Sequence, residues 1–286
     1  DIALAQAAFP DAPFEAHKAW PEVIHRYLAG TLGLLIILVS ARAWQLRRLQ
    51  DQPLKLPLFL LVLVIAQGLF GMWTVTLKLW PQVVTTHLLG GFATLSLLWL
   101  LCLRLDNKPW PQPNIHVRHW IKLRPLAALG LALVIVQISL GGWVSSNYAA
   151  LACPDLPTCQ NQWWPNMNFS SGFNAFQEIG PNYLGGQLDG EARVAIHVTH
   201  RIGAILVAAV LGLLVYLLFK NAGGRELKNL GTVILTLLVV QLMLGFSNII
   251  FQLPLWVAVA HNAGGALLLL SLVTLNYRLN KSTAVF

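Results

Sequence analysis

The stretch "IHVTHRIGAILVAAVLGLLVYLLFK", residues 196–220, decides the fold of this chain. After Arg201 it is apolar almost to its end, and about 20 apolar residues in a helix span the roughly 30 Å hydrocarbon core of a bilayer. Similar runs predict transmembrane helices near residues 23–45, 56–77, 82–104, 122–146, 195–220, 228–250 and 255–278. The sequence therefore predicts an all-α integral membrane protein with seven transmembrane helices.

The composition of the 286-residue chain agrees with a membrane protein. Hydrophobic residues make up 56% of it and charged residues only 10%, whereas a soluble domain carries roughly 25% charged residues. The net charge of +8 comes from Lys and Arg that are spread over separate connections rather than clustered with aromatic residues. This distribution excludes a nucleic-acid-binding protein and indicates that membrane lipid surrounds the chain.

The positions of the Lys and Arg residues predict how the chain crosses the membrane. Connections on the cytoplasmic side of a membrane protein are enriched in both residues. Fourteen of the 19 Lys and Arg lie in four segments, 42–55, 104–124, 220–228 and 278–281. We therefore expect a multi-pass protein of the plasma (inner) membrane with a cytoplasmic C-terminus. Its N-terminus and its long loop, residues 147–194, would lie on the outer side.

Two of the three cysteines, Cys153 and Cys159, lie in this outer loop within "ACPDLPTC". Outer compartments are oxidising, so we expect a disulfide between them. A metal site is the weaker alternative, because no His and no second Cys pair stand near them in the sequence. Cys102 falls within a predicted helix, where we expect it to be a small buried residue.

An internal repeat relates the two halves of the chain. His25-Arg26 matches His200-Arg201 at an offset of 175. Two further matches share an offset of 174, "QGLFG" (67–71) with "QLMLG" (241–245) and "HLLGG" (87–91) with "HNAGG" (261–265). Three helices therefore recur in the same order along the chain.

The second half contains one helix, 122–146, that has no counterpart in the first half. We expect two pseudo-symmetric four-helix bundles, with the first helix of the N-terminal half absent from this sequence. The N-terminal half then covers residues 1–119. The C-terminal half covers residues 120–286 and includes the outer loop 147–194.

Each half carries two histidines near the outer ends of its predicted helices, His25 and His87 in the first and His200 and His261 in the second. Ionisable residues within transmembrane helices usually face the bundle interior or a functional path. A metal ion bound by side chains alone usually needs three or four ligands at one point. Two histidines on different helices suit the axial positions of a heme. We expect a heme in each half, with structural hydrogen bonding as the alternative.

The residues around the histidines fit a flat ligand. Residues three and four positions later share the face of residue i, and here they include Ala29, Gly90, Gly91, Gly203, Ala204, Gly264 and Gly265. A heme packs closely on such a surface, although small residues also serve helix–helix contact in lipid. Arg26 and Arg201 are candidate partners of heme propionates, or interfacial residues whose charged ends reach water.

The two halves differ in one acidic residue. Glu22 lies three residues before His25, on the same helix face, whereas the residue three before His200 is His197. A carboxylate beside one site predicts that only this site carries out chemistry, with Glu22 relaying protons or stabilising positive charge during an oxidation. The alternative is an acid that favours the positive end of a helix dipole.

Five stretches together resemble the heme A synthase family: "PEVIHRYLAGTLGLL", "VVTTHLLGG", "GGWVSSNYAALACPDLPTC", "HVTHRIGA" and "HNAGGALLLL". The most specific are the Glu-x-x-His-Arg start and the Cys-Pro-Asp-x-Pro-x-Cys loop, and the resemblance covers nearly the whole chain. It implies a membrane oxidoreductase that converts heme O to heme A, for terminal oxidases, by oxidising a ring methyl group to a formyl group. A Cys pair often found after the family's first helix is absent here.

By this resemblance, His200 and His261 would ligate a resident heme b. His25 and His87 would hold the substrate heme O, with Glu22 as the acidic residue needed for the reaction. Heme O synthase and cytochrome oxidase assembly factors are the implied partners, and a homo-oligomer is left open. The rival functions are an electron-transfer cytochrome b with two hemes, and a heme transporter or chaperone. The presence of Glu22 in only one half is evidence against the cytochrome. The position of the histidines near one membrane surface is evidence against the transporter.

Overall fold

The computed structural model describes residues 4, 15–49, 52–106, 117–221 and 225–281. In these residues the secondary structure is entirely helical, and seven of the helices are long and apolar enough to cross a membrane. This result confirms the prediction of a multi-pass, all-α membrane protein. The helices are α2 (Ala16–Gln45), α3 (Lys55–Thr76), α4 (Pro81–Asp106), α5 (Val117–Ser146), α6 (Phe169–Gly172), α7 (Gly190–Asn221), α8 (Arg225–Ile250) and α9 (Leu255–Lys281).

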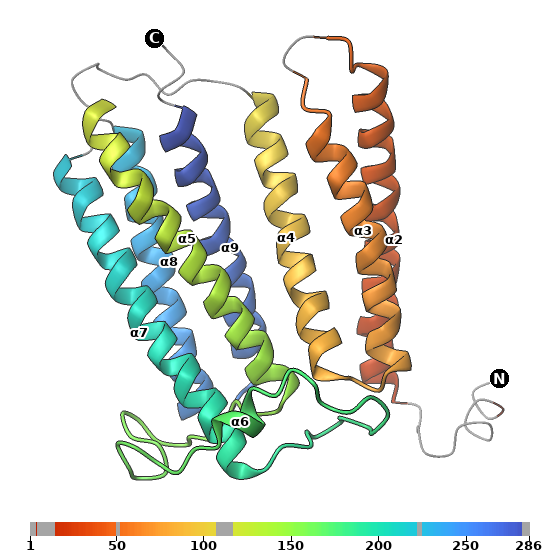
Figure 1. Cartoon of the computed structure of the whole chain (residues 1–286), viewed down its shortest axis with the longest axis vertical. Helices are drawn as coiled ribbons and strands as arrows, with labels where there is room; N and C mark the ends of the chain where they lie inside the picture. Colours follow the sequence, from red (N-terminus) through yellow and green to blue (C-terminus); the bar gives the residue numbers. More distant parts are fainter. Residues whose placement is uncertain (1–3, 5–14, 50–51, 107–116, 222–224, 282–286) are drawn as a thin grey trace. The chain divides into compact units, whose positions relative to one another are not determined.

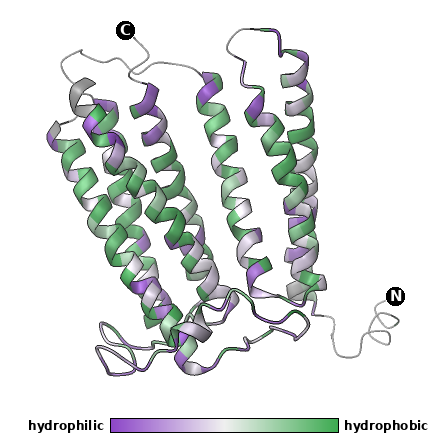
Figure 2. Ribbon diagram, viewed as in Figure 1, coloured by the Kyte–Doolittle hydropathy of each residue, from purple (hydrophilic) through white to green (hydrophobic). Residues whose placement is uncertain are grey.

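The surface of these helices is apolar (Figure 2). Large side chains such as Leu34, Ile205 and Met243 are 65%, 70% and 62% exposed. An apolar surface of this extent would aggregate in water. In a bilayer it contacts lipid, and the helices satisfy their own backbone hydrogen bonds, as membrane-spanning segments must. Cys102 is also exposed, so the expectation of a buried thiol was wrong, because an apolar side chain in a membrane helix can face lipid as readily as protein.

The chain forms two compact units, Asp1–Ile65 and Ala66–Phe286. In the first unit the buried Ser40 of α2 donates its hydroxyl hydrogen to the carbonyl oxygen of Pro57, 2.9 Å away at the start of α3. This bond joins the two helices on either side of their connection. The internal repeat predicts a boundary between residues 119 and 120, whereas the two compact units meet between residues 65 and 66. Compactness does not test sequence symmetry, so the boundary expected from the repeat stays a prediction.

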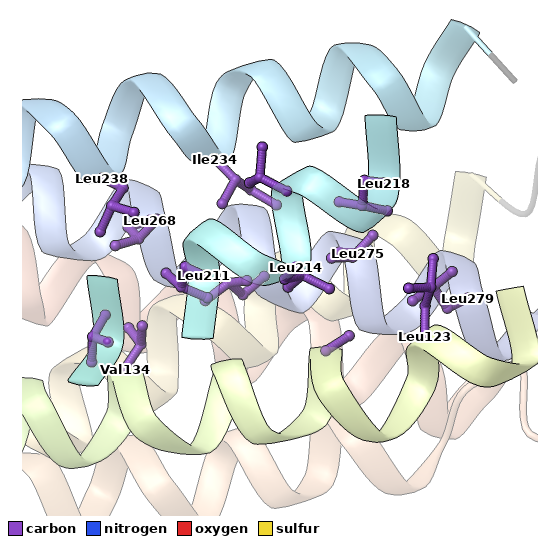
Figure 3. Close-up of a cluster of buried hydrophobic side chains, with 14 of the residues drawn as sticks. Leu123, Val134, Leu211, Leu214, Leu218, Ile234, Leu238, Leu268, Leu275 and Leu279 are labelled. Carbon is purple, nitrogen blue, oxygen red and sulfur yellow. The ribbon is translucent and has the colours of Figure 1, made fainter. Parts of the chain in front are cut away.

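Four helices of the second unit pack in a ring (Figure 1). Helix α5 contacts α7, α7 contacts α8, α8 contacts α9, and α9 closes the ring on α5. Helices α7 and α9 therefore occupy one diagonal of the bundle. The interior is filled by one leucine-rich stripe from each helix, for example Leu211, Leu214 and Leu218 at spacings of three and four on α7 (Figure 3). Close packing of this kind holds helices together in lipid, where the hydrophobic effect does not.

Helix α4 packs on the outside of this ring, against α5 and α9. Near its start, Thr85 shares a hydrogen bond of 3.0 Å with Ser146 of α5. Towards its other end, the indole N–H of Trp99 donates to Thr274 of α9 over 2.8 Å. Hydroxyl and indole groups thus connect α4 to the ring at both ends, which fixes the register of the helix that carries His87.

The loop between α5 and α7 lies at the end of the bundle where α7 and α9 begin (Figure 1). Its short helix α6 is capped by Asn168, whose side chain accepts a hydrogen bond from the Ser171 amide. The indole of Trp143 donates to the Gly172 carbonyl over 2.7 Å, and the Tyr183 amide donates to the Lys78 carbonyl over 3.0 Å. The loop is therefore bound to both α5 and the α3–α4 turn.

Basic residues of the second unit gather at the opposite end of the bundle from this loop (Figure 2). They lie where α4, α7 and α9 end and where α8 begins, namely Arg104, Lys220, Arg225, Lys228, Arg278 and Lys281. In membrane proteins the basic end faces the cytoplasm.

Candidate functional site

His200 lies on α7, two to three turns after the helix begins, and faces Gln137 of α5. The Gln137 side-chain amide donates to the His200 carbonyl over 2.9 Å, and the same nitrogen lies 3.1 Å from His200 Nδ1. Two glycines make room for this arrangement. A Cβ on Gly203 would overlap the Gln137 amide, and one on Gly141 would lie 3.4 Å from His200 Cε1. Any larger residue at Gly203 would displace the amide.

His261 on α9 repeats this arrangement with residues of α8. The Gln241 side-chain amide donates to the His261 carbonyl over 2.9 Å, and a Cβ on Gly264 would overlap that amide. A Cβ on Gly245 would lie 3.6 Å from His261 Cε1. The Nδ1 atom of His261 is buried and has no hydrogen-bond partner in the described part of the chain.

His87 on α4 has the same kind of surroundings, supplied by α3. A Cβ on Gly90 would overlap the Gln67 amide, and a Cβ on Gly71 would lie 3.2 Å from His87 Cε1. Three of the four predicted histidines therefore stand beside a glutamine and a glycine of the preceding long helix. His25 differs in sequence. Leu28 stands three residues after it, whereas glycine stands three residues after each of the other three histidines.

The structure brings His200 and His261 to one bundle, on the two helices of its diagonal. Among the described residues, no three His, Cys, Asp or Glu side chains form a cluster, so the potential metal ligands come singly from facing helices. The His200 ring stands next to Gly141 and the His261 ring next to Gly245. Paired imidazoles, glycine beside each ring and a buried ring nitrogen without a partner fit a heme with two axial histidines.

Glu22 and Arg26 form an ion pair on α2. Arg26 Nη2 lies 2.5 Å from Glu22 Oε1, and the two side chains are 65% and 51% exposed. The spacing of four residues places Glu22 and Arg26 on one helix face, and the spacing of three places His25 beside Glu22. His25 belongs to the first compact unit and His87 to the second.

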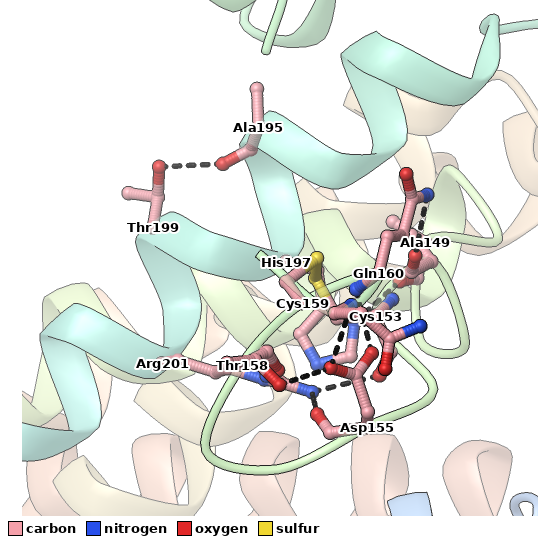
Figure 4. Close-up of a disulfide and its surroundings, with 12 residues drawn as sticks. Ala149, Cys153, Asp155, Thr158, Cys159, Gln160, Ala195, His197, Thr199 and Arg201 are labelled. Carbon is pink, nitrogen blue, oxygen red and sulfur yellow. Dashed lines mark hydrogen bonds between the residues drawn. A yellow bond between two sulfur atoms is a disulfide. The ribbon is translucent and has the colours of Figure 1, made fainter. Parts of the chain in front are cut away.

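Arg201, expected to pair with a heme propionate, binds the loop that the Cys153–Cys159 disulfide closes, called the cystine loop (Figure 4). Its Nη1 donates to the Thr158 carbonyl over 2.8 Å, and its Nη2 donates to the carbonyls of Cys153 and Asp155 over 2.7 and 3.0 Å. The Nε of Arg201 is buried without a partner among the described residues. These bonds use three of the five guanidinium N–H groups, so the Nε–H and one Nη1–H remain for another acceptor.

His197, one turn before Arg201, also faces the cystine loop. It is 4% exposed, and its Nδ1 lies 3.0 Å from the Ala149 carbonyl and 3.4 Å from the Cys153 amide. One nitrogen cannot donate to the carbonyl and accept from the amide at once, so its tautomer selects the partner. His197 and Arg201 together fix the loop to the turn of α7 that carries His200.

The predicted disulfide joins Cys153 and Cys159, whose Cα atoms are 4.6 Å apart. Between them Asp155 organises the loop. Its carboxylate accepts hydrogen bonds from the Thr158 hydroxyl and from the amides of Gln160 and Asn161. The Thr158 hydrogen bond, with the two backbone ones, holds the Asp155 pKa below its ordinary value of 3.8. The expected disulfide is thereby confirmed.

Sequence reasoning missed the glutamines. "QGLFG" and "QLMLG" served only to align the two halves, although both carry the Gln-x-x-x-Gly spacing, and "QISLG" at 137–141 is a third copy. Each copy is followed one helix later by His-x-x-Gly. The repeated spacing is the signal that could have identified Gln67, Gln137 and Gln241 as partners of the histidines.

Comparison with known proteins adds to this geometry. A family model described as cytochrome oxidase assembly protein, COX15-CtaA, matches residues 1–273. The chain belongs to this family. The Heme A synthase of Shewanella oneidensis is 49% identical over 278 residues, which cover 97% of this chain and 81% of the relative. That of Methylobacterium nodulans is 31% identical over 268 residues, covering 90% and 69%. The COX15-CtaA membership confirms the resemblance to heme A synthases drawn from the motifs.

Proposed function

We propose that the protein is a heme A synthase, a membrane oxidoreductase that converts heme O to heme A for terminal oxidases. One observation carries the proposal: His200 and His261 lie on the two diagonal helices of one bundle, in a chain that matches Heme A synthases over nearly its whole length. The reaction oxidises a ring methyl group to a formyl group. It removes electrons and protons from the methyl carbon and adds one oxygen atom.

We infer that the two halves divide this work. In the C-terminal half, residues 120–286, His200 and His261 would hold a resident heme b. In the N-terminal half, residues 1–119, His25 and His87 hold the substrate heme O. When bound, the heme b iron supplies the one-electron chemistry that side chains cannot provide.

The side chains of this chain position the groups and handle protons. Glu22 accepts a proton released from the reacting carbon, or stabilises positive charge that develops there. Arg26, 2.5 Å from the carboxylate, orients Glu22 beside His25. Arg26 and the free Nε of Arg201 are the candidate donors to heme propionates.

We propose that the protein lies in the plasma (inner) membrane with its basic helix ends in the cytoplasm. The cystine loop then lies on the outer side, where a disulfide is maintained. The chemistry implies heme O synthase as the supplier of substrate and cytochrome oxidase assembly as the destination of product.

The test is the identity of the hemes that the purified protein carries when produced in cells that also make heme O. Chromatography and mass spectrometry of the extracted hemes should give heme B together with heme O, a hydroxylated form, or heme A. Heme B alone would favour an electron-transfer cytochrome b. A preparation without heme under conditions that load other membrane cytochromes would overturn the ligand assignment.

A further inference from the structure

Two neighbouring tryptophans in the loop between α5 and α7, Trp163 and Trp164, project from the protein. Their side chains are 79% and 69% exposed. The chain is fixed on both sides of them, because Gln162 and Cys159 exchange two backbone hydrogen bonds of 2.9 and 3.0 Å and Pro165 is buried. The pair therefore forms a short tip that is held at both of its ends.

The lipid-facing surface of α7 begins only after Arg201. Before it, Ala192 and Ile196 are fully buried by α5 and the loop. After it, Ile202 and Ile205 are 51% and 70% exposed, and in a membrane these apolar side chains contact lipid. Arg201 thus marks the level at which lipid replaces protein around α7.

The tryptophan tip is connected to this level. Arg201 donates to the Thr158 carbonyl over 2.8 Å, the next residue, Cys159, pairs with Gln162, and Trp163 follows Gln162 directly. In Figure 1 the loop extends past α7, beyond the outline of the four-helix ring. The tip therefore lies beside the start of the lipid-facing surface of α7.

The composition of the loop suits a membrane surface. Between Asp155 and Asp189 the sequence has one charged residue, Glu178, whereas roughly a quarter of the residues in a soluble domain are charged. Tryptophan is enriched where the bilayer meets water, because its ring is apolar and its N–H donates a hydrogen bond. The tip thus combines the residue type of a membrane interface with the absence of charges that would resist it.

We propose that Trp163 and Trp164 form a membrane anchor. Their indoles lie in the headgroup region of the leaflet around the loop end of the bundle, beside α7, and hold the cystine loop at the membrane surface. Exposed aromatic residues also bind protein partners. A partner would have to displace lipid from α7, and the segment 156–177 offers it no charged side chain for the polar rim of a protein interface. The anchor does not depend on the proposed function.

Spin labels measure the depth of the tip in the whole chain. In a Cys102→Ala background, Trp163→Cys and Trp164→Cys each carry a nitroxide at the tip, and Ser170→Cys carries one at an exposed position of α6 in the same loop. Labelling without a reductant preserves the native disulfide. In phosphatidylcholine nanodiscs, power saturation compares collisions with oxygen, which concentrates in the bilayer, with collisions with a water-soluble nickel chelate.

We expect the oxygen-to-nickel ratio to be several times higher at positions 163 and 164 than at position 170. Because the tip is uncharged, the ratio should not change with salt or with added phosphatidylglycerol. Equal ratios at the three positions would overturn the anchor and leave the tip exposed for a protein partner. Protection from nickel that appears only in larger discs with two copies would assign the pair to a contact between copies, and would overturn the anchor as well.

A second experiment needs no label. Trp163→Ser combined with Trp164→Ser removes the anchor, and Phe176→Ser is the matched control, because this aromatic side chain of the same loop is 93% exposed. In nanodiscs, a phosphine should reduce the disulfide faster in the double variant than in the wild type, whereas Phe176→Ser should match the wild type. Equal reduction rates in all three proteins would show that the pair does not hold the cystine loop, and would overturn the proposal.

Discussion

Arg201 donates a hydrogen bond of 2.7 Å to the carbonyl of Cys153, so the residue directly after the proposed heme ligand His200 holds the cystine loop. The loop and the ligand therefore share one turn of α7. Any movement of the loop acts on that turn through the arginine.

Arg201→Lys should loosen the cystine loop without removing the positive charge. A lysine cannot reach three carbonyls from one planar group, and each lost hydrogen bond from a charged donor costs about 1.5 kcal/mol or more. We expect the disulfide to be reduced at least roughly tenfold faster, measured with a phosphine reductant and thiol counting. Arg193→Lys is the control, because Arg193 binds the carbonyl of Leu188 elsewhere in the same loop. Equal rates in both variants would contradict the role of Arg201.

Glu22→Gln should stop product formation while heme binding persists. The amide can still accept from Arg26, so the geometry stays but the negative charge is lost. Removing a general acid–base group costs about 10²-fold or more in rate, and heme A formation in membranes measures it. Glu226→Gln, in the first turn of α8, is the control for an acid at a helix start. Normal turnover of Glu22→Gln would remove this residue from the mechanism.

His261→Ala should lose heme B and keep the fold. The substitution removes one of the two proposed heme ligands and leaves the Gln241 amide bound to the backbone carbonyl of residue 261, so the helix packing should be unchanged. The absorbance of the heme–pyridine complex per protein measures the loss, and circular dichroism measures the helix content. The neighbouring Asn262 is exposed, and Asn262→Ala should retain full heme. Retention of heme B by His261→Ala would exclude this residue as a ligand.

The cystine loop should open in acid through Asp155. Its pKa is lower in the folded chain than the ordinary 3.8, so its contribution to stability is complete well above pH 3.8. The contribution falls as the pH drops below 3.8 and through the lowered folded pKa. The rate of disulfide reduction by a phosphine should rise in this acid range. In Asp155→Asn the disulfide should be reduced rapidly already at neutral pH, and the reduction rate should vary less with pH. In Glu178→Gln the reduction rate should follow that of the wild type.

The orientation can be tested with single cysteines. In a Cys102→Ala background, Ser170→Cys probes the loop end of the bundle and Arg225→Cys probes the start of α8. A maleimide that cannot cross membranes should label position 170 in intact spheroplasts, and position 225 only after lysis. The reverse pattern would invert the proposed topology.

The sequence predicted the membrane helices and the disulfide because both depend on local information. A run of about 20 apolar residues is long enough to span a bilayer whatever it packs against, and Cys153 and Cys159 are close in the chain. The partners of Arg201 could not be predicted, because nothing in the sequence says that backbone carbonyls of the loop would turn towards it. The Gln137–His200 contact depends on the register between α5 and α7, which apolar periodicity does not encode.

The diagonal placement of α7 and α9 has a consequence for how the protein is made. Both helices run in the same direction, away from the loop end (Figure 1), so the chain must cross back through α8 before α9 can begin. The second imidazole of the pair thus enters the bilayer only with α9. A ribosome that stops before α9 releases a chain with half of the pair, so the proposed heme capture by both histidines is confined to chains in which α9 has been inserted.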